Sequence, residues 1–197
     1  MVIKICGITN VEDALVAAEA GAQAVGFVFY PGSPRYVRPE TAATIARALP
    51  GHIWKVGVFV NESREEIEAV VRAVSLDVVQ VHGECGWPKG VRIWRAVAVG
   101  PGFDPEALDP TGVEAFLLDA PSSGAWGGTG TPCDWTAAAR VRHRVVLAGG
   151  LGPDNVQEAI RVVQPWGVDA SSRLELSPGK KDPDKVRAFV RAALATR

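Results

Sequence analysis

Two kinds of hydrophobic pattern alternate along the whole chain. Runs such as Trp54 to Val60 are almost continuously apolar, which is typical of a strand that is buried on both faces of a sheet. Segments such as Ile67 to Val74 have apolar residues at helical spacing and therefore have one face to bury. The alternation predicts about eight strand and helix units. The predicted strands are Val2 to Ile8, Ala24 to Phe29, Trp54 to Val60, Val78 to His82, Ile93 to Val99, Ala115 to Asp119, Val145 to Ala148 and Gly167 to Ala170.

Helix start signals fall where this alternation requires them. Ser63 and Glu66 have the spacing of a capping box, in which each side chain accepts the other residue's backbone N–H. Pro39, Pro153 and Pro183 each lie where we predict a first helical turn, and a proline there costs no helical hydrogen bond.

These units predict an α/β fold, a single compact (β/α)₈ TIM barrel in which residues 1–197 form one phosphate-binding domain. The stretch between His82 and Ile93 is too short for a full helix, and the stretch between Val99 and Ala115 is rich in Pro and Gly. We therefore expect the fourth helix to be reduced or absent and the fifth helix to be short. A doubly wound open sheet is the alternative fold.

The composition and the distribution of charge argue against nucleic-acid binding and against a membrane span. Of the 197 residues, 47% are hydrophobic, and the formal net charge is -1. The basic residues are scattered, so they form no footprint for nucleic acid, and no apolar run approaches the roughly 18 residues of a membrane span. The three cysteines have no metal-ligand spacing and leave one unpaired in any disulfide scheme. We expect a soluble cytoplasmic protein without a metal site.

Residues at the carboxyl ends of barrel strands converge on one mouth, where the active sites of such barrels lie. Cys6 lies near the end of the first predicted strand, and His82 and Asp119 close the fourth and the sixth. Arg35 follows the second strand, within reach of an anionic substrate. Each residue also has a plainer interpretation: a small buried hydrophobe, a packing histidine, a turn residue and a surface charge.

Small residues cluster after the last two predicted strands. Gly149 and Gly150 follow the seventh strand, and Ser171 and Ser172 follow the eighth. Backbone N–H groups in such loops can bind a phosphate without burying a cation. A third cluster, Gly127 to Gly130, lies in a long loop after Asp119 and is interpreted as a lid or substrate loop, or as a plain flexible loop.

A series of motifs connects these residues: Lys4 to Thr9, Gly26 to Phe29 with Ser33 to Tyr36, Val56 to Asn61, Val79 to Gly83, Leu117 to Asp119, Gly127 to Gly130 and Leu147 to Leu151. In this order they resemble the phosphoribosylanthranilate isomerase family nearly from end to end of the chain. The resemblance implies a (β/α)₈ barrel of tryptophan biosynthesis. It would convert N-(5-phosphoribosyl)anthranilate to the 1-deoxyribulose 5-phosphate derivative by an Amadori rearrangement, with no metal and no organic cofactor.

The resemblance also implies roles for single residues. Asp119 would be the general acid that protonates the ring oxygen, Cys6 the general base that removes the proton on C2′, and Arg35 the partner of the anthranilate carboxylate. The acid needs a raised pKa and the base a stabilised thiolate, so we expect the two to titrate as a coupled pair. Further substrate contacts are expected at His82, Gly128, Gly149, Gly150, Ser171 and Ser172.

One departure from the family pattern concerns the last loop. Arg173 stands where the family usually has glycine. If the backbone there had a positive φ, an arginine would be strained or the loop would differ. The side chain of Arg173 either adds a cation near the phosphate or faces solvent. We also expect Lys4 and Asp169 to pair inside the barrel, across the strands that close it.

Other functions remain open at this point. A sugar-phosphate isomerase of histidine biosynthesis or a pentose-phosphate epimerase would share the glycine clusters, but the first is expected to use two carboxylates and the second a metal. A non-catalytic barrel that binds a phosphate ligand is the alternative from another class. The expected partner is a small sugar phosphate rather than nucleic acid or a membrane, and the sequence leaves a homodimer open.

Overall fold

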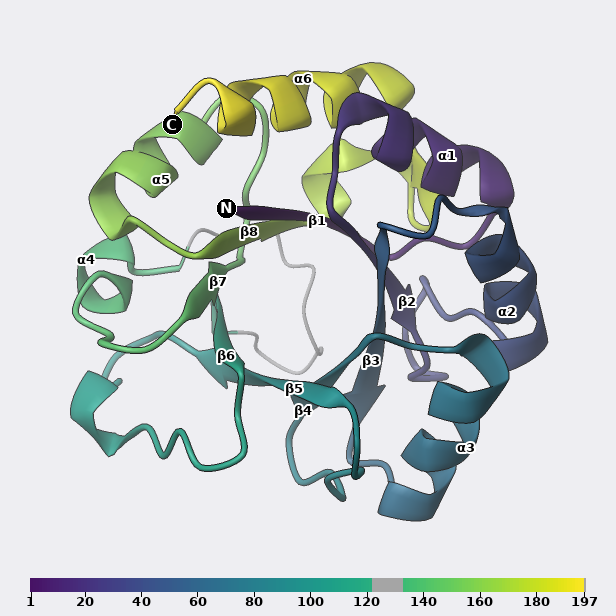
Figure 1. The fold of residues 1–197 in the computed structure, drawn as a ribbon. Coiled ribbons are helices and arrows are strands. Elements are labelled where there is room, and N and C mark those ends of the chain that lie inside the picture. The colour runs from purple at the N-terminus through teal and green to yellow at the C-terminus, as the bar shows by residue number, and fades with distance from the viewer. Residues whose placement is uncertain (122–132, 197) are drawn as a thin grey trace.

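The eight predicted strands form a closed barrel of parallel strands. The computed structural model describes residues 1–121 and 133–196. Each strand pairs with the next one along the chain, and the last strand, β8, pairs with the first, β1, so that the sheet closes on itself (Figure 1). The closed barrel confirms the predicted fold class, and the open sheet is therefore excluded. The strands are β1 (Val2–Cys6), β2 (Ala24–Val28), β3 (Trp54–Val60), β4 (Val78–His82), β5 (Arg92–Ala98), β6 (Ala115–Asp119), β7 (Val145–Leu147) and β8 (Gly167–Ala170).

The first strand ends two residues earlier than its apolar run. Gly7 has a φ of +76°, a conformation that favours glycine, and the N–H groups of both Gly7 and Ile8 donate to the carbonyl oxygen of Gly26. The chain therefore turns away from the sheet directly after Cys6, which places the thiol at the carboxyl end of β1. Predicted and observed bounds of β3, β4, β6 and β8 are identical.

Helices surround the barrel on the outside (Figure 1). Their starting residues include Asn10, whose side chain accepts the N–H of Asp13, and the predicted capping box of Ser63 and Glu66, which is confirmed. Among the described residues, no helix has the length and apolar character needed to cross a membrane. The helices are α1 (Val11–Ala20), α2 (Pro39–Ala48), α3 (Arg64–Val74), α4 (Trp135–Ala138), α5 (Val156–Val163) and α6 (Pro183–Leu194).

One predicted helix start is wrong. Pro39 and Pro183 begin α2 and α6, but Pro153 lies before α5, whose first residue is Val156. The reason is Asn155, whose side chain accepts the N–H of Gly152 and donates to the carbonyl oxygen of Gly150. These two bonds close a turn over Pro153, and the helix begins only after that turn.

The barrel has few helices on one side. The connection from β4 to β5, residues 83–91, is fully described and contains no helix, which confirms the predicted absence of the fourth helix. The predicted short fifth helix is a single 3₁₀ turn, η1 (Pro105–Ala107). After β8 a second 3₁₀ turn, η2 (Ser172–Leu174), leads into a small hairpin of β9 (Glu175–Ser177) and β10 (Lys180–Lys181).

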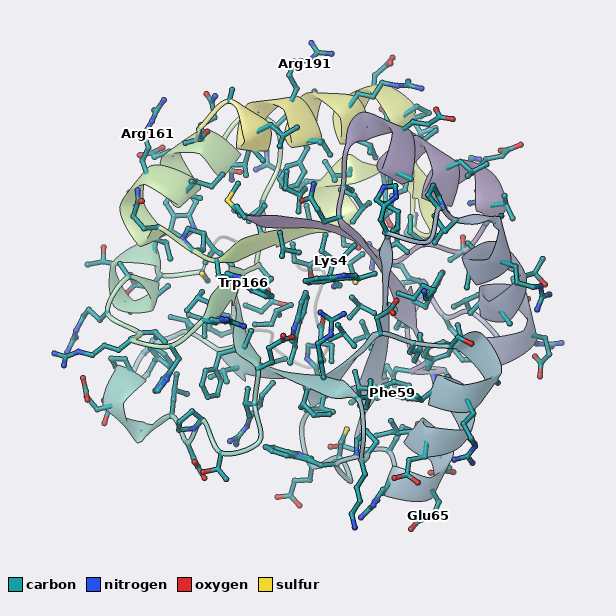
Figure 2. All side chains as sticks on the ribbon, in the orientation of Figure 1. Lys4, Phe59, Glu65, Arg161, Trp166 and Arg191 are labelled. Atoms are coloured by element: carbon teal, nitrogen blue, oxygen red, sulfur yellow. The ribbon has the colours of Figure 1, made fainter. Side chains whose placement is uncertain are left out.

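Aromatic side chains fill the amino-terminal end of the barrel interior. Trp94 is fully buried there, with Trp54 and Trp166 packed against the same cluster and the Trp166 ring edge-on to Trp94. Figure 2 shows Trp166 and Lys4 toward the centre, whereas Arg161 and Arg191 point outward. Because this end is filled with side chains, the open space of the barrel lies at the carboxyl ends of the strands.

Candidate active site

A pocket at the carboxyl ends of the strands brings together residues that are far apart in the sequence. Its lining includes five of the predicted site residues: Cys6, Arg35, His82, Asp119 and Ser171. Asp169, the predicted partner of Lys4, also lines it. Gly128 and the rest of the cluster from Gly127 to Gly130 lie outside the described residues. The convergence of strand ends that the barrel implied is therefore observed for these five side chains.

Cys6 is the last residue of β1, and its side chain is tightly enclosed beside the neighbouring strand β2. Gly26 is its register partner on β2, and a Cβ atom at position 26 would lie 2.8 Å from Cys6 Sγ and 2.9 Å from Lys4 Cε. Burial raises the pKa of the Cys6 thiol, while the charge and hydrogen bond of Lys4 oppose that rise. Cys6 is thus a buried thiol whose thiolate form has an ammonium group as its neighbour.

Lys4 and Asp169 form the pair that the sequence predicted. Lys4 Nζ lies 2.9 Å from Asp169 Oδ1, and the Lys4 side chain has no exposed surface. Burial alone would lower the pKa of Lys4, but attraction to Asp169 and Cys6 outweighs burial, and the pKa is raised. The positive charge of Lys4 is therefore favoured by its two neighbours, Asp169 and Cys6, which both line the pocket.

Asp119 lies at the end of β6, which is separated from β1 by β7 and β8 in the closed barrel. Its Oδ1 atom accepts the N–H of Ala120 at 2.8 Å. Burial raises the pKa of Asp119 to about 6; the Ala120 N–H opposes the rise, Asp169 adds to it and Lys4 opposes it. A carboxyl with this pKa can hold a proton near neutral pH, as a general acid must.

His82 is a neutral residue of the pocket. Its Nε2 lies 2.8 Å from Nε2 of Gln80, which is its neighbour on the same face of β4. Burial, with the charge of Lys4 in addition, lowers the pKa of His82 to about 4. At neutral pH His82 is uncharged, so it suits a hydrogen bond to a substrate better than transfer of a proton.

Arg35 is not a surface charge. Its guanidinium donates from Nε to Oε1 of Glu175 at 2.9 Å and from Nη2 to Oε2 at 2.7 Å. Sequence reasoning missed Glu175 and its second partner, Lys181, whose Nζ lies 2.8 Å from Oε1. Glu175 lies two residues after Arg173, in the loop where the chain departs from the family pattern, whereas nothing in the sequence around Lys181 distinguishes it from an exposed lysine.

Gly149 and Gly150 form the loop after β7. Both have a positive φ, and a Cβ at Gly149 would lie 3.0 Å from Asp119 Oδ1 and 2.8 Å from Ala120 N. Only glycine therefore lets this loop approach the acid so closely. In the next loop, Ser171 Oγ donates to the carbonyl oxygen of Cys6 at 3.1 Å, and Ser172 begins η2.

Arg173 joins these two loops. It lies in the 3₁₀ turn η2 and is not among the described residues with a positive φ, so the strain considered from the sequence does not arise. Its Nη1 donates to the carbonyl oxygen of Gly150 at 3.1 Å, and its Nη2 lies 2.8 Å from Asp154 Oδ2. The side chain is partly exposed but held at both ends of its guanidinium rather than free in solvent.

Comparison with known proteins identifies the family. The family model described as "N-(5'phosphoribosyl)anthranilate (PRA) isomerase" matches residues 3–192. The chain belongs to the phosphoribosylanthranilate isomerase family. A member of this family from Pelobacter propionicus is 50% identical over 202 residues, which cover 99% of this chain and 96% of the relative.

Solved structures of the isomerase family have the same fold. The crystal structure of phosphoribosyl anthranilate isomerase from Thermotoga maritima is 44% identical, covers 99% of this chain and 100% of its own, and has a TM-score of 0.89. A further structure of the isomerase was determined in complex with reduced 1-(o-carboxyphenylamino)-1-deoxyribulose 5-phosphate. It is 42% identical, with a TM-score of 0.85 and coverage of 99% of this chain and 100% of its own.

Proposed function

We propose that this chain converts N-(5'-phosphoribosyl)anthranilate to 1-(2-carboxyphenylamino)-1-deoxyribulose 5-phosphate in tryptophan biosynthesis, with Cys6 as the general base and Asp119 as the general acid. One observation supports these roles above all. The thiol at the end of β1 and the carboxyl at the end of β6 line one pocket, whose lining also includes Arg35. A relative with the same fold was solved with a reduced form of this product.

The reaction needs one acid and one base on the two sides of the sugar. Asp119 donates its proton to the ring oxygen, the ring C–O bond breaks, and the anthranilate nitrogen and C1′ form a protonated imine. Cys6 as thiolate then removes the proton on C2′, and the electron pair moves to give an enolamine. Tautomerisation of the enolamine yields the ketose, so no net oxidation of the substrate occurs.

The resting protonation state differs from the state that reacts. The pKa of Asp119 is about 6 and that of Cys6 is raised, so at pH 7 most molecules carry an ionised Asp119 and a neutral thiol. The reactive form has the same number of protons, with one moved from Cys6 to Asp119. Lys4 favours this form because its ammonium stabilises the thiolate.

The two ends of the substrate are anionic and need separate binding groups. We assign the phosphate to the backbone N–H groups of Gly149, Gly150, Ser171 and Ser172. Gly128, in the loop after Asp119, is proposed as a further substrate contact. Arg35 binds the anthranilate carboxylate, since a guanidinium matches a carboxylate with two N–H donors. His82, neutral at physiological pH, donates or accepts one hydrogen bond.

The decisive experiment combines turnover with ligand binding. Substrate generated in situ is supplied to the wild type and to the variants Cys6→Ala and Asp119→Asn, without added metal and with a chelator present. Loss of a general acid or base should lower kcat by about 10²- to 10⁴-fold, whereas binding of a reduced product analogue should persist in both variants. Full activity in either variant would contradict the assigned roles and favour a barrel that only binds its ligand.

Further proposals concern the domain organisation, the location and the partners of the protein. We propose that residues 1–197 act as one domain, that the protein works in the cytoplasm, and that it needs no cofactor and no nucleic acid. A homodimer is a further proposal, since one structure of the Thermotoga maritima enzyme is described as monomers generated from a dimeric protein. Sedimentation of the purified protein tests the dimer, and activity in the presence of chelator tests the absence of a metal requirement.

A further inference from the structure

Glu175 is a buried carboxylate shared by two cations. It accepts two N–H groups of Arg35 and the ammonium of Lys181, and its side chain is 4% exposed while that of Lys181 is 0% exposed. The cluster of Arg35, Glu175 and Lys181 contains two positive charges and one negative charge, a net charge of +1. Since two cations share one carboxylate and Arg35 lines the pocket, an anion that enters the pocket beside Arg35 is attracted to the cluster.

The cluster fixes the position of the guanidinium. A Cβ atom at Gly7 would lie 2.6 Å from Arg35 Cδ, so the side chain of Arg35 passes directly against the backbone that follows Cys6. On the other side, Lys181 is held by its backbone N–H, which donates to Asp13 at 2.7 Å. Arg35 therefore has little freedom to turn, although its own loop after β2 contains no helix or strand.

The guanidinium keeps hydrogen-bond donors for a ligand. It has five N–H groups, of which Glu175 takes the one on Nε and one on Nη2. Within the described part of the chain, no hydrogen bond from Arg35 Nη1 is observed, and Arg35 lines the pocket. Two N–H groups on Nη1 and one on Nη2 therefore remain for an incoming anion, in an arrangement that suits the two oxygens of a carboxylate.

Lys181 also contacts the loop that follows β8. Its Nζ donates to the carbonyl oxygen of Ser171 at 3.3 Å, and Ser171 is one of the residues assigned above to the phosphate. One buried cluster thus touches both the group for the carboxylate and the loop for the phosphate. It sets the spacing between the two anionic ends of the pocket.

We propose that Glu175, supported by Lys181, is a positioning residue that orients Arg35 toward the carboxylate of the substrate and so makes the pocket selective for ribosides with an ortho-carboxylated aromatic amine. The inference rests on the proposed function, because it takes the isomerisation as the reaction that is measured. It goes beyond the assignment of Arg35, since it makes the selectivity depend on a residue that does not itself touch the substrate.

The test compares two substrates that differ only in the carboxylate. Ribose 5-phosphate condensed in situ with anthranilate gives the natural substrate, and condensed with aniline it gives the analogue that lacks the carboxylate. In Glu175→Gln we expect kcat/KM for the natural substrate to fall about 10- to 100-fold, mainly through KM, with a much smaller change for the analogue. The ratio of the two kcat/KM values should therefore fall. Glu12→Gln, which alters an exposed carboxylate paired with Lys180 of the same hairpin, should leave the ratio unchanged.

A double variant separates position from charge. Glu175→Gln combined with Lys181→Gln removes one charge of each sign, so the net charge of +1 stays and no buried ammonium is left without a partner. We expect this variant to lose selectivity as the single variant does. A ratio equal to that of the wild type in either variant overturns the proposal, because net charge or Arg35 alone would then suffice. If the wild type itself fails to isomerise the natural substrate, it is the proposed function that is wrong.

Discussion

Gly26 and Cys6 face each other across β1 and β2, so closely that a Cβ at position 26 would come within 2.8 Å of the thiol sulfur. The same atom would lie 3.2 Å from the Cα of Cys6, which is backbone and cannot yield as a flexible side chain can. The space occupied by the proposed base therefore exists only because residue 26 has no side chain.

We predict that Gly26→Ala lowers kcat by about 10²-fold, because the sulfur must move by a large part of an ångström away from its productive position. Steady-state kinetics with substrate generated in situ measures the effect. Gly51→Ala is the matched control, since no atom lies within 4 Å of a Cβ at that exposed position, and it should not change kcat. An unchanged kcat in Gly26→Ala would mean that the position of Cys6 does not limit the reaction.

The pH dependence of kcat/KM should show how many protons Cys6 and Asp119 together hold in the active enzyme. Both groups are protonated below about pH 6, where Asp119 titrates, and both are ionised above the raised pKa of Cys6. Activity requires one proton on the pair, so kcat/KM should rise through about pH 6 and fall only at alkaline pH. The variant His82→Asn tests whether Asp119 or His82 causes the rise in kcat/KM near pH 6. Because the pKa of His82 is about 4, the rise near pH 6 should persist in this variant. Loss of that rise would assign it to the histidine.

Asp119→Asn should stabilise the protein at neutral pH. The folded state raises the pKa of Asp119 from an ordinary value of 3.8 to about 6, so it binds the proton more tightly than the unfolded chain does. The destabilisation is absent below the unfolded pKa, grows as pH rises, and is complete above the folded pKa. At pH 7.5 the variant should therefore gain up to about 3 kcal/mol in the free energy of unfolding, and at pH 3.5 little or nothing. Urea unfolding at the two pH values measures the difference, and an equal gain at both would exclude titration of Asp119 as its cause.

Removing the guanidinium of Arg173, which joins the loops after β7 and β8, should weaken substrate binding but leave the rate of the chemical step unchanged. In Arg173→Ala the bonds to Gly150 and Asp154 are lost, and we expect KM and the inhibition constant of inorganic phosphate to rise a few-fold while kcat stays the same. The loss of stability should stay below about 1 kcal/mol, because the ion pair with Asp154 is partly exposed. Asp154→Asn keeps the bond to Gly150 and should have the smaller effect. A drop in kcat without a change in KM would argue against a role in phosphate binding.

The fold was readable from the sequence because its signals are local and repeated. Apolar strands and one-sided helices alternate, and the missing helix after β4 follows from the short stretch between His82 and Ile93. The ends of the strands, with Cys6 and Asp119, then follow from the barrel. Pro153 was misplaced because a side chain two residues later closes a turn, and that bond depends on three-dimensional geometry.

The charges behind the site could be predicted only in part. Lys4 and Asp169 were paired correctly because the closing strands of a barrel must meet, and the register places the two residues opposite each other. No rule of this kind applies to Glu175 and Lys181. They belong to a hairpin of two short strands, β9 and β10, and charged residues in such a hairpin are expected to face solvent. Their burial arises from contact with Arg35, which is 140 residues away from Glu175 in the sequence.

The sparse helical cover between β4 and β6 has a consequence for the motions of the barrel. On this arc the outer faces of the strands are covered by side chains from loops, such as Phe103 and Leu108, instead of by a packed helix. Amide hydrogens of β5 should therefore exchange with solvent sooner than those of β1 and β2, through local opening at a lower free energy. His82 and Asp119 end the two strands that flank β5, whereas Cys6 and Lys4 belong to the well-covered half. We therefore expect the part of the barrel wall beside Asp119 to open locally more often than the part that holds Cys6.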